Sequence, residues 1–129
     1  MVHIAESEWI IMKELWKKSP LTSREIIDAV ADSNNWNAKT IHTLIQRLCK
    51  KGAVTAKRRK DTSFYNYYPN VSQKECAISE TKHFLKKIYS GSLKNLVSTF
   101  VEDDSVSRQE IEELKLLLET LEKEKNDDI

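Results

Sequence analysis

Residues 36–54 read WNAKTIHTLIQRLCKKGAV. The apolar residues at positions 41, 44, 45 and 48 have the spacing of one buried stripe on an amphipathic helix. Asn37 is a favourable N-cap, and Gly52 follows the last apolar position as a C-terminal stop. We therefore expect a helix from about Asn37 to Lys51. Its other face carries hydroxyl, imidazole, amide and basic groups, with no carboxylate.

The absence of acid extends past this helix. From Lys39 to Lys60 the chain has eight basic residues and no acidic residue. Residues 1–70 carry a formal net charge of +5 and residues 71–129 carry −4, although the whole chain carries only +1. This asymmetry predicts two modules with different partners, and a polyanion is the natural partner of the basic one. The plain alternative is a solvated surface without a partner.

Three further segments have the signature of a helix start. LTSREI (21–26), VSQKEC (71–76) and VSRQEI (106–111) each place Ser or Thr three residues before Glu, with apolar flanks. This pattern is a capping box with a hydrophobic staple. Combined with apolar periodicity, it predicts six helices. Their expected ranges are about 6–17, 23–31, 37–51, 73–89, 93–101 and 108–123.

The segment between residues 53 and 69 has a different texture. Its ends are rich in β-branched and aromatic residues, and its middle is polar and charged. We expect two antiparallel strands, about Val54–Lys57 and Phe64–Tyr68, joined by a loop and ended by Pro69. A two-stranded hairpin is marginal alone, so it should pack on the helices.

Three helices followed by a hairpin is the order of a winged helix-turn-helix. The chain is therefore predicted to be mainly α with a small β-hairpin: a winged helix-turn-helix DNA-binding domain at residues 1–70, followed by a three-helix dimerisation domain at residues 71–129. The third helix would lie in the major groove, where acid is excluded because a carboxylate would face phosphates. The base-reading residues expected on it are Lys39, Thr40, His42, Thr43, Gln46 and Arg47. The residues expected to contact phosphate, on the helix end and the wing, are Lys50, Lys51, Arg58, Arg59, Lys60 and Tyr67.

The last three helices carry more apolar surface than a hydrophobic core within one chain would bury. A helix face of this kind indicates a partner, and a two-fold dimer would present two reading helices to DNA. Packing within one chain is the plain alternative. The residues expected at the dimer interface are Leu93, Leu96, Val97, Phe100, Val101, Leu114, Leu117, Leu118 and Leu121.

Several stretches together resemble the BlaI/MecI family of penicillinase repressors. They are IAESEWIIMKELW (4–16), WNAKTIHTLIQRLCKKGAV, FYNYYPNV (64–71), FLKKIYSGSLKNLVSTFVEDD (84–104) and EIEELKLLLETLEKE (110–124). The resemblance implies a dimeric repressor on inverted-repeat operators of genes for β-lactam resistance. It also implies release by proteolysis, with a membrane-bound zinc-protease sensor as a transient partner.

The chain departs from the family pattern at three places. His42 stands on the reading face where relatives commonly have Arg or Gln, so the resemblance implies a different operator. Ala5 replaces the Ser that caps the first helix, so Glu8 is expected to lack its capping partner. The family is cut at an Asn-Phe bond, and the matching bond here is Thr99-Phe100. The site is carried over as a hypothesis.

Other classes of protein find less support. No apolar run is long enough to span a membrane and no secretory signal is visible, so we expect a cytoplasmic protein. The two cysteines lie 27 residues apart, without Cys-x-Cys or Cys-x-x-Cys spacing. We expect no cofactor and no metal, which argues against the copper-responsive type of repressor, the nearest alternative. A winged-helix module for protein partners remains open. No catalytic motif indicates an enzyme.

Overall fold

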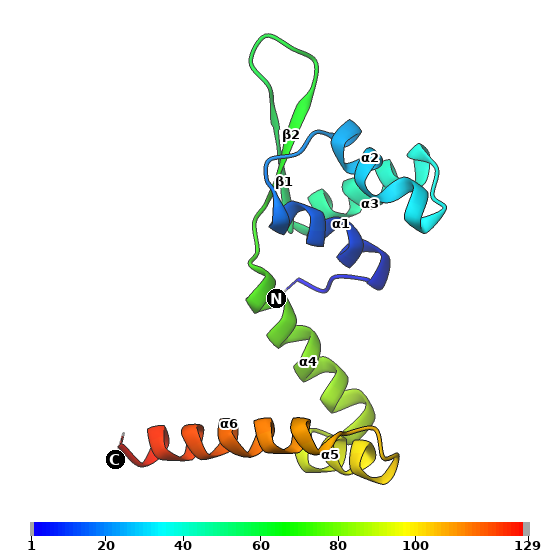
Figure 1. Cartoon of the computed structure of the whole chain (residues 1–129). Coiled ribbons are helices and arrows are strands. Elements are labelled where there is room, and N and C mark those ends of the chain that lie inside the picture. Colours follow the sequence, from blue (N-terminus) through cyan, green and yellow to red (C-terminus); the bar gives the residue numbers. More distant parts are fainter. Residues whose placement is uncertain (1, 128–129) are drawn as a thin grey trace. The chain divides into compact units, whose positions relative to one another are not determined.

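The computed structural model describes residues 2–127. Along this part of the chain it has six helices and one hairpin (Figure 1). One compact unit ends at His83 and the next begins at Phe84, inside α4, and each is described by itself. The domain boundary predicted after residue 70 stays a prediction. The elements are α1 (Glu6–Lys17), α2 (Ser23–Asn34), α3 (Ala38–Lys51), β1 (Val54–Arg58), β2 (Tyr65–Pro69), α4 (Gln73–Tyr89), α5 (Leu93–Glu102) and α6 (Arg108–Asp127).

The predicted helix starts are confirmed by their hydrogen bonds. Asn37 Oδ1 accepts from the Thr40 N–H at 2.8 Å. At α2 the box is complete, because the Glu25 N–H donates to Thr22 Oγ1 (3.2 Å) and the Thr22 N–H donates back to Glu25 Oε1 (3.0 Å). The bond from the Thr22 N–H, followed by one from its hydroxyl, lowers the pKa of Glu25. Gly52 ends α3 at φ +84°, a left-handed conformation that suits glycine.

The first unit is built around the apolar stripe of α3. Its four members lie between 0% and 5% exposed, as the spacing predicted. They pack against the inner faces of α1 and α2, and Ala53 and Val54 close the core at the start of the hairpin. The main core residues are Ile11, Met12, Leu15, Ile26, Val30, Ile41, Leu44, Ile45 and Leu48.

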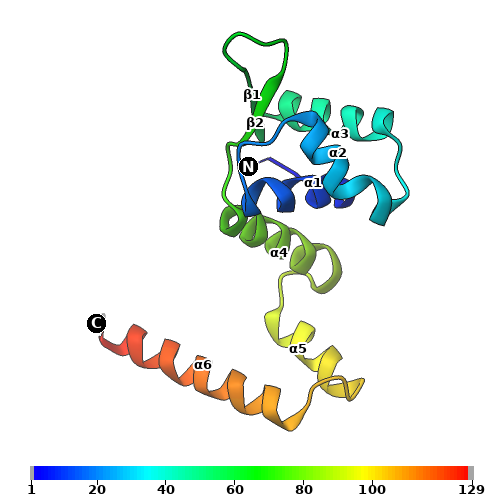
Figure 2. The same cartoon turned by 45° about the horizontal axis from the view of Figure 1, so that its top comes forward.

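The hairpin is tied to the helices by backbone as well as by side chains. β1 and β2 pair antiparallel, with Val54 opposite Pro69 and Arg58 opposite Tyr65. The Tyr67 N–H donates to the Leu21 carbonyl at 2.8 Å, so the linker between α1 and α2 forms a bridge to β2. The loop of the hairpin extends beyond the three helices in both Figure 1 and Figure 2. This is the placement of a wing.

Some element ends differ from the sequence-based ranges. β2 includes Pro69, because the next N–H, that of Asn70, still donates across to the Ala53 carbonyl (2.8 Å). α2 continues three residues beyond the expected Ala31, and Asn35 ends it in the left-handed conformation at φ +54°. Asn is one of the few residues that adopt this conformation readily, so it replaces the usual glycine.

In the second unit, α5 and α6 have no buried residue among those described. Large apolar side chains nevertheless repeat along both helices, and Leu93, Val101 and Leu117 are each more than 60% exposed. A helix pair of this kind has not completed a core within one chain. Among residues 2–127, no helix has the length and apolar character needed to cross a membrane.

We predict that Leu48→Ala lowers the free energy of unfolding by about 2–5 kcal/mol, because it leaves a cavity in the hydrophobic core. Leu48 is 0% exposed. Lys50→Ala, two residues along the same helix and exposed, is the control and should stay within about 0.5 kcal/mol of the parent protein. Urea denaturation measures both. Similar stability of the two variants would contradict this account of the core.

Candidate nucleic-acid interface

The reading face of α3 is the exposed side opposite its apolar stripe. All six side chains predicted to read bases are exposed there: Lys39, Thr40, His42, Thr43, Gln46 and Arg47. The N-terminal half of the face carries small hydroxyls and an imidazole, and Arg47 and Lys50 follow on the next turns. Lys39 precedes these hydrogen-bonding groups and Arg47 and Lys50 follow them, so positive charge flanks the face at both ends, which suits a helix inserted between two phosphate backbones.

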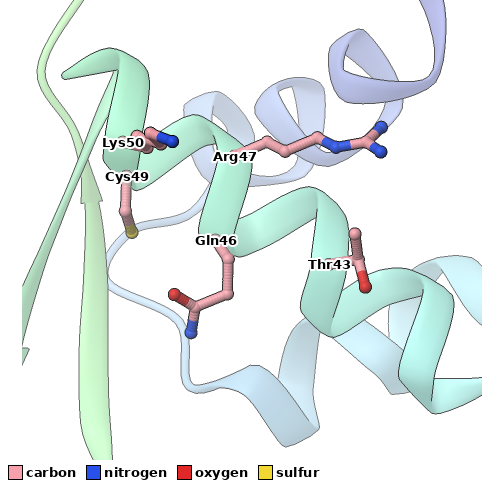
Figure 3. A pocket seen from close by; sticks show the side chains of 5 residues that line it. All are labelled: Thr43, Gln46, Arg47, Cys49 and Lys50. Carbon is pink, nitrogen blue, oxygen red and sulfur yellow. The ribbon is translucent and has the colours of Figure 1, made fainter.

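A shallow hollow on α3 is lined by three of these side chains, Thr43, Gln46 and Arg47, together with Cys49 and Lys50 (Figure 3). Within it, Thr43 Oγ1 donates to the Lys39 carbonyl at 3.0 Å. The hydroxyl proton is therefore engaged by the helix backbone. What Thr43 offers outward is its methyl group and an acceptor lone pair, of which the methyl suits a thymine C5-methyl.

Cys49 is a member of this face that the sequence did not reveal as a site residue. It lies half-buried near Gln46 and Lys50, about two turns beyond His42. Burial raises the pKa of the Cys49 thiol, so the group stays protonated and neutral at physiological pH. Helical spacing places residue 49 at the edge of the reading face. This spacing is the signal in the sequence that could have identified Cys49.

The wing carries the second positive group. Arg58, Arg59 and Lys60 are exposed at the end of β1 and in the loop that follows. Arg58 Nε donates to the Thr62 carbonyl at 3.1 Å, which braces the loop and leaves the other guanidinium N–H groups free to donate outward. The tip is hollowed between residues 58 and 63. Thr62 and Ser63 therefore join the candidate surface, although their hydroxyls in a turn gave only a weak signal.

Lys51 differs from the other residues expected to contact phosphate. Its Nζ forms an ion pair with Glu8 Oε1, and the Glu8 side chain is only 1% exposed. This placement argues against the predicted phosphate contact, because the ammonium of Lys51 is already paired with a buried carboxylate, although its side chain is one-third exposed. It also corrects the expectation for Glu8. That carboxylate still accepts from the Ala5 N–H at 2.8 Å, half of the capping box, and has Lys51 as a second partner.

Tyr67 is likewise drawn inward. It is 9% exposed and belongs to the hydrophobic core, and burial raises the pKa of its phenol. The other hairpin aromatics differ: Phe64 and Tyr65 are 58% and 46% exposed. Tyr65 and Tyr67 have the same parity on β2, but only Tyr67 lies over the helices. Its position argues against the phosphate contact predicted for its hydroxyl, and packing accounts for the residue.

Taken together, the reading face and the wing define a winged-helix DNA-binding protein. A polar helix face without acid is held by a buried core, and basic groups flank it on the helix end and on the hairpin. In proteins of this class, phosphate contacts from basic groups supply affinity and position, and base contacts from the helix supply specificity.

Comparison with known proteins identifies the family. The model of the penicillinase repressor family matches residues 4–120. The methicillin resistance regulatory protein MecI of Staphylococcus aureus (strain N315) is 37% identical over 115 residues, 89% of this chain and 92% of that protein. The penicillinase repressor of Bacillus licheniformis is 34% identical over 116 residues, 90% of this chain and 89% of its own. The chain belongs to the penicillinase repressor family.

A solved structure agrees with the fold of the first unit. It is the solution structure of the monomeric form of Bacillus licheniformis BlaI in complex with the blaP half-operator. The two share 32% sequence identity with a TM-score of 0.50, over 57% of this chain and 87% of the BlaI chain. The expected winged helix-turn-helix is thereby confirmed. The family description names a repressor and not a class of enzyme.

We predict that Arg59→Ala weakens binding to any DNA duplex and reduces the slope of log affinity against log salt by about one, as expected when one phosphate contact is lost. Tyr67→Phe should bind with unchanged affinity and slope, because its hydroxyl belongs to a residue packed in the core. Fluorescence anisotropy across a salt series measures both quantities. A shallower slope for Tyr67→Phe would return that hydroxyl to the phosphate-contacting set.

Proposed function

We propose that this protein is a dimeric, sequence-specific DNA-binding repressor of genes for β-lactam resistance. The observation that carries the proposal is the exposed, acid-free face of α3 beside a basic wing, in a chain of the penicillinase repressor family. The relatives are named as a methicillin resistance regulator and a penicillinase repressor, and the BlaI structure holds a half-operator. The genes and DNA proposed here follow those names.

The proposed operator is an inverted repeat. A two-fold dimer presents the same helix twice, so its two half-sites are related by the same symmetry. Selection of binding sites by the full chain from random duplexes tests this. The expected result is enrichment of an inverted repeat whose affinity falls steeply as salt rises. Binding without enrichment of any sequence would contradict specific repression, and absence of salt-dependent binding would favour a module for protein partners.

Homodimerisation through α5 and α6 is supported by their exposed apolar residues. Of the nine residues expected at the interface, eight are exposed and Leu96 is half-buried. A second copy of the chain would cover this surface and supply the core that each helix pair lacks. The acidic groups of α6 would stay at the solvated edge.

Regulation by proteolysis is proposed at the Thr99-Phe100 bond, with a membrane-bound zinc protease as the transient partner. The bond lies near the end of α5, where Phe100 is 48% exposed and Thr99 Oγ1 donates to the Asn95 carbonyl at 3.1 Å. A helical bond must unwind to enter a protease active site. Because α5 has no buried residue, that local opening has little packing to overcome in one chain.

The alternative of a copper-responsive repressor depends on Cys-x-Cys motifs. The two cysteines of this sequence, Cys49 and Cys76, each lack a second cysteine two residues away. The repressor of β-lactam resistance genes is therefore the function that we retain.

We predict that a chain ending at Ser98 is monomeric and binds the operator at least about tenfold more weakly, because it lacks most of the apolar surface of α5 and α6. A chain ending at Lys123 is the matched control, because it loses only the acidic end and should remain a dimer. Sedimentation gives the mass and anisotropy the affinity. A dimeric chain ending at Ser98 would contradict both the proposed interface and the proposed effect of cleavage.

We also predict that His42→Ala changes which operator sequence is preferred, since His42 is exposed on the reading face. Arg59→Ala should lower affinity for all sequences and leave the preference unchanged. Binding-site selection on both variants separates the two roles. An unchanged profile for His42→Ala would remove this residue from the base-reading set.

A further inference from the structure

One charged side chain is buried in the core of the first unit without a role in the function proposed so far. The side chain of Glu8, on α1, is 1% exposed. A carboxylate taken out of water costs several kcal/mol unless partners compensate it. Two do so here: the Ala5 N–H at the start of α1, at 2.8 Å, and the ammonium of Lys51 at the end of α3.

The pair joins two helix ends that are 43 residues apart in sequence. Glu8 lies in the first turn of α1, where the helix dipole favours a negative charge, and Lys51 is the last residue of α3, where the dipole favours a positive one. Each charge is therefore stabilised by its own helix as well as by the other. The Lys51 side chain is one-third exposed, so only the carboxylate side is fully enclosed.

The chain next to Lys51 connects the reading helix to the wing. The Gly52 N–H donates to the Cys49 carbonyl (3.1 Å) and the Ala53 N–H to the Leu48 carbonyl (3.0 Å), which closes the end of α3. Ala53 is 0% exposed, and β1 begins at the next residue. Any movement of Lys51 relative to α1 is therefore passed to both DNA-facing elements.

We propose that Glu8 is a positioning residue for DNA recognition: by holding Lys51, it fixes the end of the reading helix and the start of the wing against α1. The inference rests on the proposed DNA-binding function and assigns a recognition role to a carboxylate that faces away from DNA. Glu8 acts only through Lys51 and the junction that follows it.

Two other accounts of the pair make different predictions. If Lys51 contacted phosphate, freeing it from Glu8 would raise DNA affinity. If the pair served stability alone, its loss would lower the free energy of unfolding and leave the affinity of the folded protein unchanged. Positioning requires instead that the folded protein binds more weakly although its positive charge has increased.

The test compares Glu8→Gln with Glu14→Gln in the full chain. Glu14 lies on the same helix, pairs at 3.4 Å with Lys17 within α1, and undergoes the same loss of one negative charge. We expect the affinity of Glu8→Gln for the selected operator to fall about tenfold, the scale of one base contact. Glu14→Gln should stay within about twofold of the parent. Equal affinities of the two variants, or tighter binding by Glu8→Gln, would overturn the proposal.

A spectroscopic measurement reports the junction directly. The chain has only two glycines, Gly52 and Gly91, so protein labelled with ¹⁵N-glycine gives two amide signals. Gly52 directly follows Lys51, and Gly91 lies in the second unit. We expect Glu8→Gln to shift the Gly52 signal and leave the Gly91 signal in place, and Glu14→Gln to shift neither. An unmoved Gly52 signal in Glu8→Gln would count against positioning.

The double variant Glu8→Gln/Lys51→Met keeps the test decisive if Glu8→Gln does not fold. It removes both charges, so the net charge is unchanged, and replacing a whole buried pair is often neutral for stability. Positioning predicts a folded protein with affinity several-fold below the parent at an unchanged salt slope. Parental affinity, or a slope about one unit shallower as expected for a lost phosphate contact of Lys51, would overturn it. If the parent itself shows no salt-dependent, sequence-selective binding, the proposed function fails, whereas normal parental binding with unaffected Glu8 variants sinks only the positioning role.

Discussion

The burial of one apolar stripe on α3 is the constraint on which the rest of the first unit depends. Ile41, Leu44, Ile45 and Leu48 fill the space between α1, α2 and the hairpin. Because 3.6 residues make a turn, burying these four leaves the opposite side of the helix in solvent. A packing requirement and a recognition surface are therefore two sides of one helix. The polar side is free to vary for a new DNA sequence while the apolar side preserves the fold.

Charge is distributed in a way that keeps structural and DNA-facing groups apart. The one buried carboxylate of the described core, Glu8, lies on α1 and pairs with Lys51, whose side chain is one-third exposed. Lys39, Arg47 and Lys50 remain exposed on α3. Adjacent lysines at positions 50 and 51 thus have different environments, because successive helix residues point about 100° apart. The basic run from 39 to 60 is continuous in sequence, but Lys51 pairs with a buried carboxylate whereas Lys39, Arg47 and Lys50 lie on the exposed face of α3.

Much of this arrangement follows from local rules that the sequence displays. The caps at Asn37 and Thr22, the stop at Gly52 and the apolar period of α3 are contained within one or two turns of chain, so pattern and propensity predict them. The pair of Glu8 with Lys51 and the inward position of Tyr67 are not local. They depend on which helix lies behind which strand, and neither spacing nor alternation carries that information. Strand alternation places Tyr65 and Tyr67 on the same face of β2 and would predict the same burial for both, but Tyr65 is exposed and Tyr67 is buried.

The exposed apolar surface of α5 and α6 has a consequence for how operator occupancy depends on the concentration of the protein. If those helices gain their core only from a second chain, the amount of dimer rises with the square of the monomer concentration until most chains are paired. Occupancy of a two-fold operator then has a threshold in the number of copies in the cell. A modest loss of intact chains near that threshold would empty the operator disproportionately. The response would be steep without any communication between binding sites on one molecule.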